Sequence, residues 1–447
     1  MNALSHPSAS GTLSEQLDLK SLGHELYAIV QDLYPLCRSI TGEGLRDTLR
    51  AVDRVAGVEI HEVPSGTRAF DWTVPKEWNI KAAYIADVQG RKIIDFKNSN
   101  LHVVGYSTPI RKRVARAELL QHVYTHPGNP DWIPYRNSYY KETWGFCVTQ
   151  KQLAALTDAE YDVCIDSTLA DGSLSYGETL LPGATQREVL ISTHACHPSL
   201  CNDNLSGIAV AALLARQLRT VRTRYSYRFL FIPCTIGPIA WLSANQPATS
   251  RIDHGLVLAC LGDAGGMTYL RSRRATAEID RAVQHVLGHS GQAHEIRPFS
   301  PYGYDQRQYC SPGFNLAMGC LMRTPNGEYP EYHTSADNLD KVRPEFLADS
   351  FAKILATLCI LEDNRHYVSA VQHGEPHLGR RGLYDKAQEF GLFWLLNYSD
   401  GQHSLLDIAE ISGVAFNKLA AGVRMLQAVD LLDEATPSLA HVNTSER

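Results

Sequence analysis

The stretch EVLISTHACHPSLCNDNLSGIAVAALLARQLR (residues 188–219) joins an apolar strand, "EVLIST", to an apolar helix through a polar turn. Beyond it, "YRFLFIPC" and "GLVLACLG" predict two more buried strands, and "TAEIDRAVQHVLGHS" and "EFLADSFAKILATLCILE" predict helices. Apolar strands that alternate with helices are typical of a parallel sheet covered on both faces. Residues 166–376 are therefore predicted to form an α/β domain with a mostly parallel sheet.

The segments on either side of this domain differ in character. Residues 20–60 predict amphipathic helices that belong to the same domain. Residues 61–165 contain short extended pieces broken by Gly, Pro and Asn, which predict a β-rich insert domain. Residues 377–435 predict three helices resembling a winged-helix domain. Flexible tails are expected at residues 1–19, which are rich in Ser, Pro and Gly, and at 436–447.

Composition limits the classes of partner and the compartment. The net charge of -6 over 447 residues gives no reason to expect a nucleic acid or an anionic membrane as a partner. No apolar run approaches the roughly 20 residues of a membrane span. The N-terminus does not read as a secretory signal, and the ten cysteines contain no CxxC pair. Reduced thiols and a cytoplasmic location are therefore expected.

Polar residues gather where the predicted strands end. His194 and His197 follow "EVLIST", Asp203 leads into the next helix, Asp263 follows "GLVLACLG", and His333 lies in "EYPEYHTSADN". Ligands of open α/β sheets bind at the carboxyl ends of the strands, and imidazole with carboxylate is a zinc donor set. Each residue also has a plain structural interpretation, since a histidine often only forms hydrogen bonds and Asp203 could cap its helix.

The motifs "CHPSLCNDNLSG" and "YHTSADN" resemble those of the zinc aminopeptidase clan. The whole chain is similar to a bacterial aminopeptidase-like family with a β-rich swivelling insert and a C-terminal winged helix. The phrases "VPSGTRAFDWTVPKEWNI", "SNLHVVGYSTPI", "IPYRNSYYKETWGFC" and "PEYHTSADNLD" carry this resemblance. It implies zinc, one ion rather than two, held by Asp203, Asp263, His333 and either His194 or His197.

Further residues are candidates for supporting or substrate-binding roles. Asp337, four residues after His333, is expected to orient the ligand loop or to take part in catalysis. Arg307 and Lys141 are candidate anchors for a substrate carboxylate, by their charge alone. Tyr309, in "RQYCSPGFNL", is a further candidate for substrate binding. The aromatic stretch at residues 133–147 either lines the substrate site or packs the insert against the α/β domain.

The chain departs from the family at the catalytic base. Where the family pattern resembles "PETIGS", this chain has "PCTIGP" (residues 233–238), so Cys234 replaces the glutamate base and Thr235 replaces the next zinc ligand. Gln306 similarly replaces a glutamate in "DQRQY". Losing a general base removes roughly 10²- to 10⁴-fold in rate. Cys234 can be a buried apolar residue, a thiolate ligand or a nucleophile, whereas Cys196 and Cys201 lack a partner at a recurring spacing.

These observations favour a zinc-dependent hydrolase for an amide or peptide-like small molecule, with altered acyl-transfer chemistry suited to specialised metabolism. The alternative is a pseudoenzyme that kept the fold and serves as a binding or scaffold protein. A winged-helix transcription factor is disfavoured, because the chain from residue 377 on carries six Lys and Arg against nine Asp and Glu. The expected partner is a small-molecule or peptide-like substrate, with no nucleic acid and no membrane. A homo-oligomer is left open.

Overall fold

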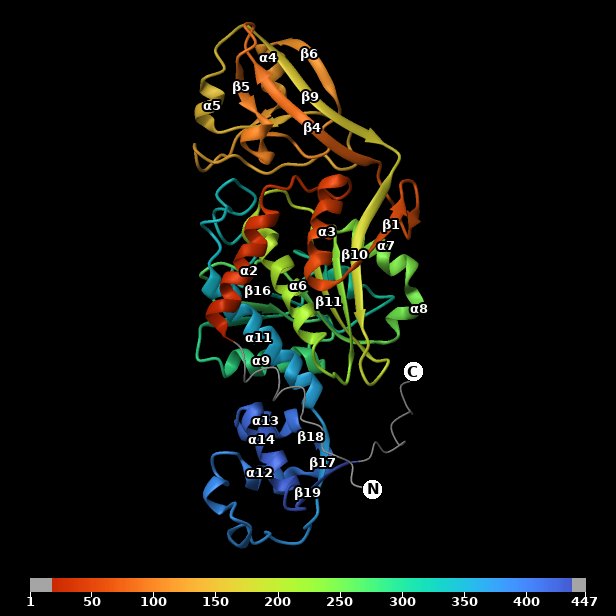
Figure 1. Cartoon of the computed structure of the whole chain (residues 1–447), viewed down its shortest axis with the longest axis vertical. Coiled ribbons are helices and arrows are strands. Elements are labelled where there is room, and N and C mark those ends of the chain that lie inside the picture. The colour runs from red at the N-terminus through yellow and green to blue at the C-terminus, as the bar shows by residue number, and fades with distance from the viewer. Residues whose placement is uncertain (1–17, 436–447) are drawn as a thin grey trace.

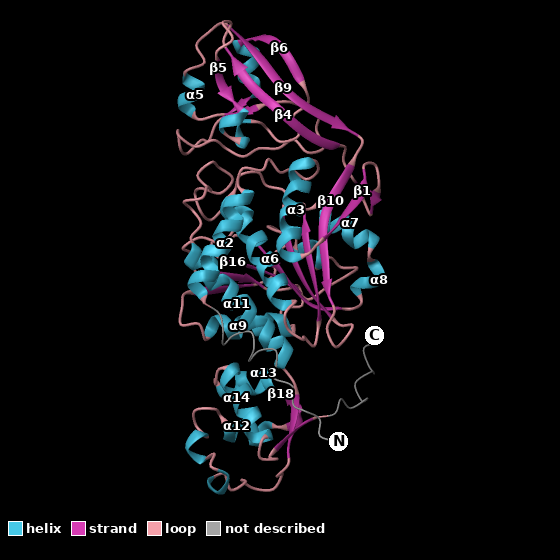
Figure 2. Ribbon diagram, viewed as in Figure 1, coloured by secondary structure: helices cyan, strands magenta, loops and turns pink. Residues whose placement is uncertain are grey.

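A computed structural model describes residues 18–435, so the two expected tails lie outside the described residues apart from their inner edge at 18–19. The chain folds into three parts stacked along one long axis (Figure 1). The β-rich insert lies at one end, the α/β domain in the middle and the C-terminal domain at the other end (Figure 2). Among residues 18–435 no helix is both long and apolar enough to cross a membrane.

The α/β domain is built on an eight-stranded sheet. Its four interior strands run parallel, and antiparallel pairs occur toward both edges. The predicted α/β fold is thus confirmed, with the parallel part confined mainly to the strands that lead to the site. In spatial order the strands are β1 (Glu59–Pro64), β10 (Ser173–Leu181), β12 (Ser226–Ile232), β11 (Glu188–His194), β13 (Ile252–Leu258), β16 (Met318–Met322), β14 (Met267–Leu270) and β15 (His294–Arg297).

Helices cover both faces of this sheet. Ile191 of β11 belongs to the apolar cluster under the larger helical layer, whereas its neighbour Leu190 belongs to the cluster on the opposite face. Successive strand side chains point to opposite faces, so apolar residues at both positions require cover on both sides. The larger layer contains α2 (Leu19–Leu33), α3 (Glu43–Ala56), α6 (Ser206–Leu218), α9 (Glu278–Gly288) and α11 (Pro344–Asp363). On the opposite face, α7 (Ile236–Ala244) and α10 (Gln306–Tyr309) contribute to the second apolar cluster, and the short helix α8 (Gln246–Thr249) follows α7.

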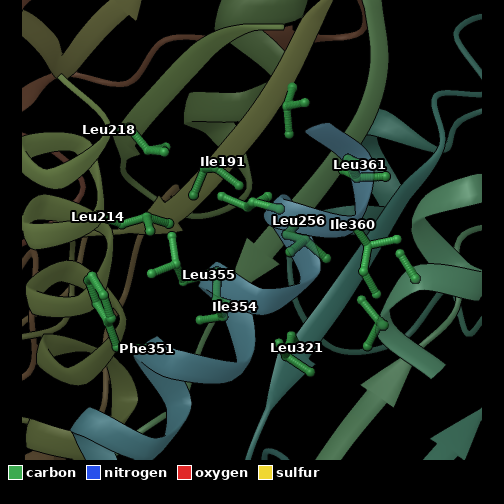
Figure 3. Close-up of a cluster of buried hydrophobic side chains, with 14 of the residues drawn as sticks. Ile191, Leu214, Leu218, Leu256, Leu321, Phe351, Ile354, Leu355, Ile360 and Leu361 are labelled. Atoms are coloured by element: carbon green, nitrogen blue, oxygen red, sulfur yellow. The ribbon is translucent and has the colours of Figure 1, made fainter. Parts of the chain in front are cut away.

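The core beneath α6 and α11 holds the site-bearing strands in place. Side chains from strands and helices meet there in one buried cluster (Figure 3). Burying each leucine or isoleucine contributes about 1.5–3 kcal/mol, which outweighs the entropy of ordering that side chain. The labelled members are Ile191, Leu214, Leu218, Leu256, Leu321, Phe351, Ile354, Leu355, Ile360 and Leu361.

The insert domain contains a four-stranded antiparallel sheet in the order β5 (Lys92–Asp95), β4 (Glu77–Ala86), β9 (Glu160–Ala170) and β6 (Ile110–Ala115). The expected boundary at residue 61 falls inside β1, which pairs with β10 in the large sheet. β9 runs on into β10 through Gly172, where an added Cβ would lie 2.5 Å from Glu77 Cβ. Shorter elements nearby are β2 (Arg68–Ala69), β3 (Trp72–Thr73), β7 (Val123–Tyr124), β8 (Phe146–Cys147), α4 (Arg116–Leu119) and α5 (Gln150–Ala154).

The C-terminal domain has a three-stranded sheet with helices against it. The strands β17 (His366–Ser369), β18 (Asp400–Ser404) and β19 (Leu432–Glu434) pair in the order β18-β17-β19. β17 begins before residue 377, the expected start of the domain. The helices are α12 (Leu392–Tyr398), α13 (Leu405–Ser412) and α14 (Phe416–Gln427). The first of the three expected helices is thus shorter than its sequence pattern suggested, because Tyr384–Lys386 form a short 3₁₀ helix and residues 387–391 form turns.

Candidate metal centre

The carboxyl end of β11 delivers the first candidate ligand. Every residue of β11 is buried, and the strand lies between β12 and β13, parallel to both. His194 is its last residue, and its Nε2 lies 2.8 Å from Asp203 Oδ1. The other ring nitrogen, Nδ1, lies 3.2 Å from the side-chain nitrogen Nδ2 of Asn204. The two contacts fix the ring, so that one nitrogen faces the Asp203 carboxylate.

Asp203 is the centre of a cluster of three histidines. It lies in the irregular turn η4 (Cys201–Leu205) before α6 and is fully buried. His333 Nε2 is 3.0 Å from Asp203 Oδ2, and His197 Nε2 is 3.8 Å from the same oxygen. Burial opposes ionisation of Asp203, but the charges and hydrogen bonds of the histidines hold its pKa well below its usual range. A charged carboxylate therefore persists inside the protein.

This donor set fits a zinc ion. Nitrogen and oxygen ligands at zinc distances lie about 3.4 Å apart in a tetrahedral site, and the contacts to Asp203 span 2.8–3.8 Å. Ligand atoms of His194, His197 and Asp203 all lie within 4.8 Å of one another. The side chain of His333 is 34% exposed, whereas His194 and Asp203 are buried, so the cluster opens on the His333 side.

Asp337 holds the turn that carries Asp203. Its carboxylate accepts hydrogen bonds from the backbone N–H groups of Asn202 (2.7 Å) and Asp203 (3.0 Å). Burial raises the pKa of Asp337 to about 7, and the two backbone donors oppose that rise. With both oxygens directed at the backbone, Asp337 is placed to position the ligand turn.

Asp263 is not brought into this cluster. One of its oxygens accepts from the Asn202 side chain at 3.0 Å, and the other accepts from Gly265 N and Thr324 Oγ1. The reason is that β13 ends at Leu258, five residues earlier, so Asp263 lies in the turn beyond the strand end. In the structure it supports the turn around Asn202, and its role as a ligand stays a prediction.

Two buried residues near the site were missed from the sequence. Cys260, just past the end of β13, has its Sγ 2.9 Å from Tyr304 Oη, and Tyr304 Oη donates to Asp203 Oδ1 at 3.3 Å. Asp305 accepts from Thr235 N at 3.0 Å, and burial raises its pKa to about 6. The position of Cys260 just after a predicted strand could have indicated it in the sequence. Asp305 stands beside Gln306 in "DQRQY", where the sequence pattern drew attention only to the glutamine.

Cys234 lies against a second thiol. Its Sγ is 3.2 Å from Cys196 Sγ, and Cys196 Sγ is 3.4 Å from His197 Nδ1. The hydrogen bond with Cys196, together with burial, raises the pKa of Cys234 well above its usual range. In Cys196 burial is outweighed, and the contacts with Cys234 and His197 lower the pKa of the thiol. Cys196, which had no partner at a recurring spacing, thus has two partners in space.

The insert domain supplies one wall of the site. The Tyr135 ring lies 5.1 Å from the rings of both His197 and His333. Its backbone N–H donates to His333 O at 2.7 Å, and Ser335 N donates to Ile133 O at 2.8 Å. The aromatic stretch at 133–147 therefore both packs against the α/β domain and borders the histidines.

The three proposed substrate-binding residues lie in different surroundings. Tyr309 is fully buried and shares a hydrogen bond of 2.9 Å with Ser192, so it packs under the sheet. Arg307 donates to Pro301 O at 3.3 Å, and its charge acts on Asp305. Lys141 is exposed and borders a small cavity of the insert that Tyr106 also lines. None of them is in hydrogen-bond contact with the histidine cluster in the described residues, and their substrate roles stay predictions.

Comparison with known proteins agrees with this architecture. Residues 27–364 match a family described as a domain of unknown function (DUF4910), and residues 365–434 match a winged helix-turn-helix. A Clostridium acetobutylicum protein, provisionally named for polysaccharide biosynthesis and an aminopeptidase-like domain, is 48% identical over 418 residues, covering 92% of this chain and 96% of the relative.

Solved structures give the same result. A crystal structure from Clostridium acetobutylicum, provisionally described as a peptidase, has a TM-score of 0.91 at 48% identity, covering 93% of this chain and 97% of that one. A zinc aminopeptidase from Bacillus subtilis has a TM-score of 0.55 at 11% identity, covering 75% of this chain and 93% of that one, which shows a shared fold. The chain therefore belongs to the DUF4910 family and joins an aminopeptidase-like fold to a C-terminal winged helix-turn-helix.

Proposed function

We propose that the protein is a zinc-dependent hydrolase that cleaves an amide bond in a peptide-like small molecule. The observation that carries the proposal is the buried Asp203 carboxylate within reach of His194 and His333 at one open end of the sheet. We assign one zinc ion to this Asp203 centre, which is defined as Asp203 with the two histidines nearest to its carboxylate, His194 and His333; His197, which is grouped with His194 and Asp203, makes the longer contact of 3.8 Å. Zinc would supply polarisation of the carbonyl and activation of a water molecule.

The chain must also supply a proton acceptor in place of the glutamate that Cys234 replaces. Asp305 suits this role because it is a buried carboxyl group held in place by a hydrogen bond from Thr235 N. Asp305 would take a proton from the attacking water and return it to the leaving amine, so that no net proton is gained or lost. Asp337 suits it less, because its oxygens are engaged by backbone N–H groups.

The surroundings of His333 suggest a substrate with a flat or ring-shaped face. The Tyr332 ring stacks on His333 at 3.9 Å between ring centres, and Tyr135 meets the same histidine edge-on. The curated relative is provisionally named for polysaccharide biosynthesis, so N-acylated amino sugars are reasonable substrates beside short peptides. We place the reaction in the cytoplasm, because all ten cysteines, each within residues 18–435, are free thiols. The replacement of the glutamate base by Cys234 supports altered chemistry of the kind used in specialised metabolism.

The test combines metal analysis with hydrolysis assays on N-acylated amino sugars and short peptide amides. Purified protein is expected to hold zinc and to release an amine from at least one substrate, and Asp203→Asn should abolish the reaction. Asp166→Asn, at an exposed position of the insert sheet, is the matched control and should behave as wild type. Protein without zinc and without activity on the panel would overturn the proposal, and activity that appears only in Cys234→Glu would identify the native chain as a pseudoenzyme.

A further inference from the structure

A cluster of sulfur and nitrogen donors lies beside the Asp203 centre and has no role in the proposed hydrolysis. Cys196 and His197 come directly after β11, and Cys234 comes directly after β12. These strands are parallel neighbours with His194 opposite Ile232, so the two segments leave the sheet side by side. Sequence positions 38 residues apart are thereby brought into contact.

The spacing of the three donor atoms suits a metal ion. In a tetrahedral zinc site two sulfur ligands lie about 3.8 Å apart, and a sulfur and a nitrogen lie about 3.6 Å apart. Here the two Sγ atoms are 3.2 Å apart, and Cys196 Sγ is 3.4 Å from His197 Nδ1. All three donor atoms lie within 4.8 Å of one another. Separation of the two sulfur atoms by about 0.6 Å would bring them to the spacing of a tetrahedral zinc site.

The orientation of His197 separates this cluster from the Asp203 centre. Its Nδ1 faces Cys196, whereas its Nε2 faces Asp203 Oδ2 at 3.8 Å, the longest of the three histidine contacts to that carboxylate. His194 and His333 lie closer to Asp203, at 2.8 and 3.0 Å. The Asp203 centre can therefore keep its nearer ligands while His197 turns its other nitrogen to the thiols.

We propose that Cys196, His197 and Cys234 form a second metal site, a thiolate site for a soft divalent cation such as zinc. Binding exchanges two protons for the cation, one from the Cys234 thiol and one from the hydrogen-bonded Cys196–His197 pair, and both protons leave to solvent. Three protein ligands leave one coordination position open, as in zinc sites with two cysteines and one histidine. Cys234 is only partly buried, so this donor can be reached from solvent. This inference does not require the proposed hydrolysis.

The test uses cobalt(II) added to chelator-treated, reduced full-length protein without oxygen. Thiolate-bound cobalt shows charge-transfer absorption in the near ultraviolet, and carboxylate- and histidine-bound cobalt does not. We expect this band in the wild type, with about two protons released per ion bound at the thiolate site. Cys196→Ser and Cys234→Ser should each reduce the band by half or more, whereas Cys359→Ser, in α11, should leave it unchanged.

Asp203→Asn separates this inference from the proposed function. It should remove cobalt from the Asp203 centre and keep the charge-transfer band, so loss of hydrolysis with a retained band leaves the thiolate site standing. X-ray absorption spectroscopy at the zinc edge of the wild-type protein should show zinc–sulfur distances of about 2.3 Å. This measurement needs no variant, so the test stays decisive if a serine variant fails to fold. Bound cobalt without the band, or a band that survives both serine substitutions, would overturn the thiolate site.

Discussion

At the residue scale, the Asp203 centre depends on a charge that burial alone would not tolerate. An isolated carboxylate in the interior is costly, and such groups persist only when they are paired or bind a metal. The histidines around Asp203 supply that compensation, and a cation would supply more of it. The hydrogen bonds that hold the turn are then as important as the ligands themselves, because they set where the carboxylate lies.

Asp337→Asn should lower the zinc affinity of the Asp203 centre by about 10- to 100-fold. An amide has a single acceptor oxygen, so it cannot accept from both Asn202 N and Asp203 N as the carboxylate does. The measurement is competition with a fluorescent zinc chelator. Asp340→Asn, three residues along and exposed, is the control and should retain the wild-type affinity. An unchanged affinity in Asp337→Asn would show that the turn does not need this carboxylate.

Asp305→Asn should reduce kcat by roughly 10²- to 10⁴-fold, the usual contribution of a general base. Burial raises the pKa of Asp305 to about 6. A base acts only when it is unprotonated, so wild-type activity should rise as the pH increases through about 6. The variant should lose this rise, and a pH–rate profile measures it. A profile with the same ascending limb in Asp305→Asn would assign the titration to another group.

At the scale of elements, Arg46 of α3 joins the α/β domain to the insert. Its guanidinium donates to Glu77, the first residue of β4, and to Glu62 of β1 at 3.0 Å. The hydrogen bond from Arg46 is the main reason that the pKa of Glu77 falls to about 2. Glu77 also accepts from Ser173 N at the start of β10, so one ion pair ties together the strands at which the chain enters and leaves the insert.

Arg46→Met should lower the free energy of unfolding at pH 7 by about 1.5–3 kcal/mol, the range for hydrogen bonds to charged groups. Glu77 has a lower pKa in the folded state, so its contribution is complete above about 4.5 and is lost as the pH falls toward about 2. The difference between wild type and variant in chemical denaturation should therefore shrink across that range.

The control for this prediction is Arg50→Met on the same helix. Arg50 pairs with Glu43 and Asp47, but all three side chains are about half exposed. Such surface pairs contribute about 0–1 kcal/mol. Equal losses in Arg46→Met and Arg50→Met would show that the Arg46 ion pairs have no special weight at the domain junction.

At the scale of the whole molecule, the winged helix lies at the end opposite the insert (Figure 1). Arg281 of α9 forms ion pairs with Asp407 and Glu410 of α13, and Phe416 N donates to His285 Nε2 at 2.9 Å. These contacts dock the domain against the α/β domain. Its acidic balance favours a docking role over DNA binding, and the absence of a nucleic-acid partner stays a prediction.

Arg281→Met should loosen this docking without unfolding either domain. The expected result is faster proteolytic cleavage near residues 364–382, between α11 and the helices of the winged-helix domain, by several-fold at equal enzyme concentration. Arg271→Met is the control, because Arg271 hydrogen-bonds only to Gln284 and Arg297 within the α/β domain among the described contacts. Equal cleavage of all three proteins would show that the ion pairs do not hold the winged helix in place.

The sequence by itself determined the α/β fold and the winged helix, and it indicated His194, His197 and Asp203 as candidate ligands. These follow from local patterns, because buried parallel strands and their helices are uniformly apolar and the candidate ligands come at a strand end or in the turn after it. It did not determine which acidic residues reach the site. Asp263 contacts Asn202, Gly265 and Thr324, whereas Asp305 contacts Thr235 N, and these contacts depend on how distant turns pack together.

Only the tertiary structure decided that Cys196 meets Cys234, that Cys260 lies by Tyr304 near Asp203, and that Tyr135 of the insert reaches the histidines. The physical reason is that the pairing and register of the strands set which strand ends meet, and these depend on packing across the whole sheet. Two thiols 38 residues apart become neighbours because β11 and β12 pair side by side, and no spacing in the sequence records that pairing.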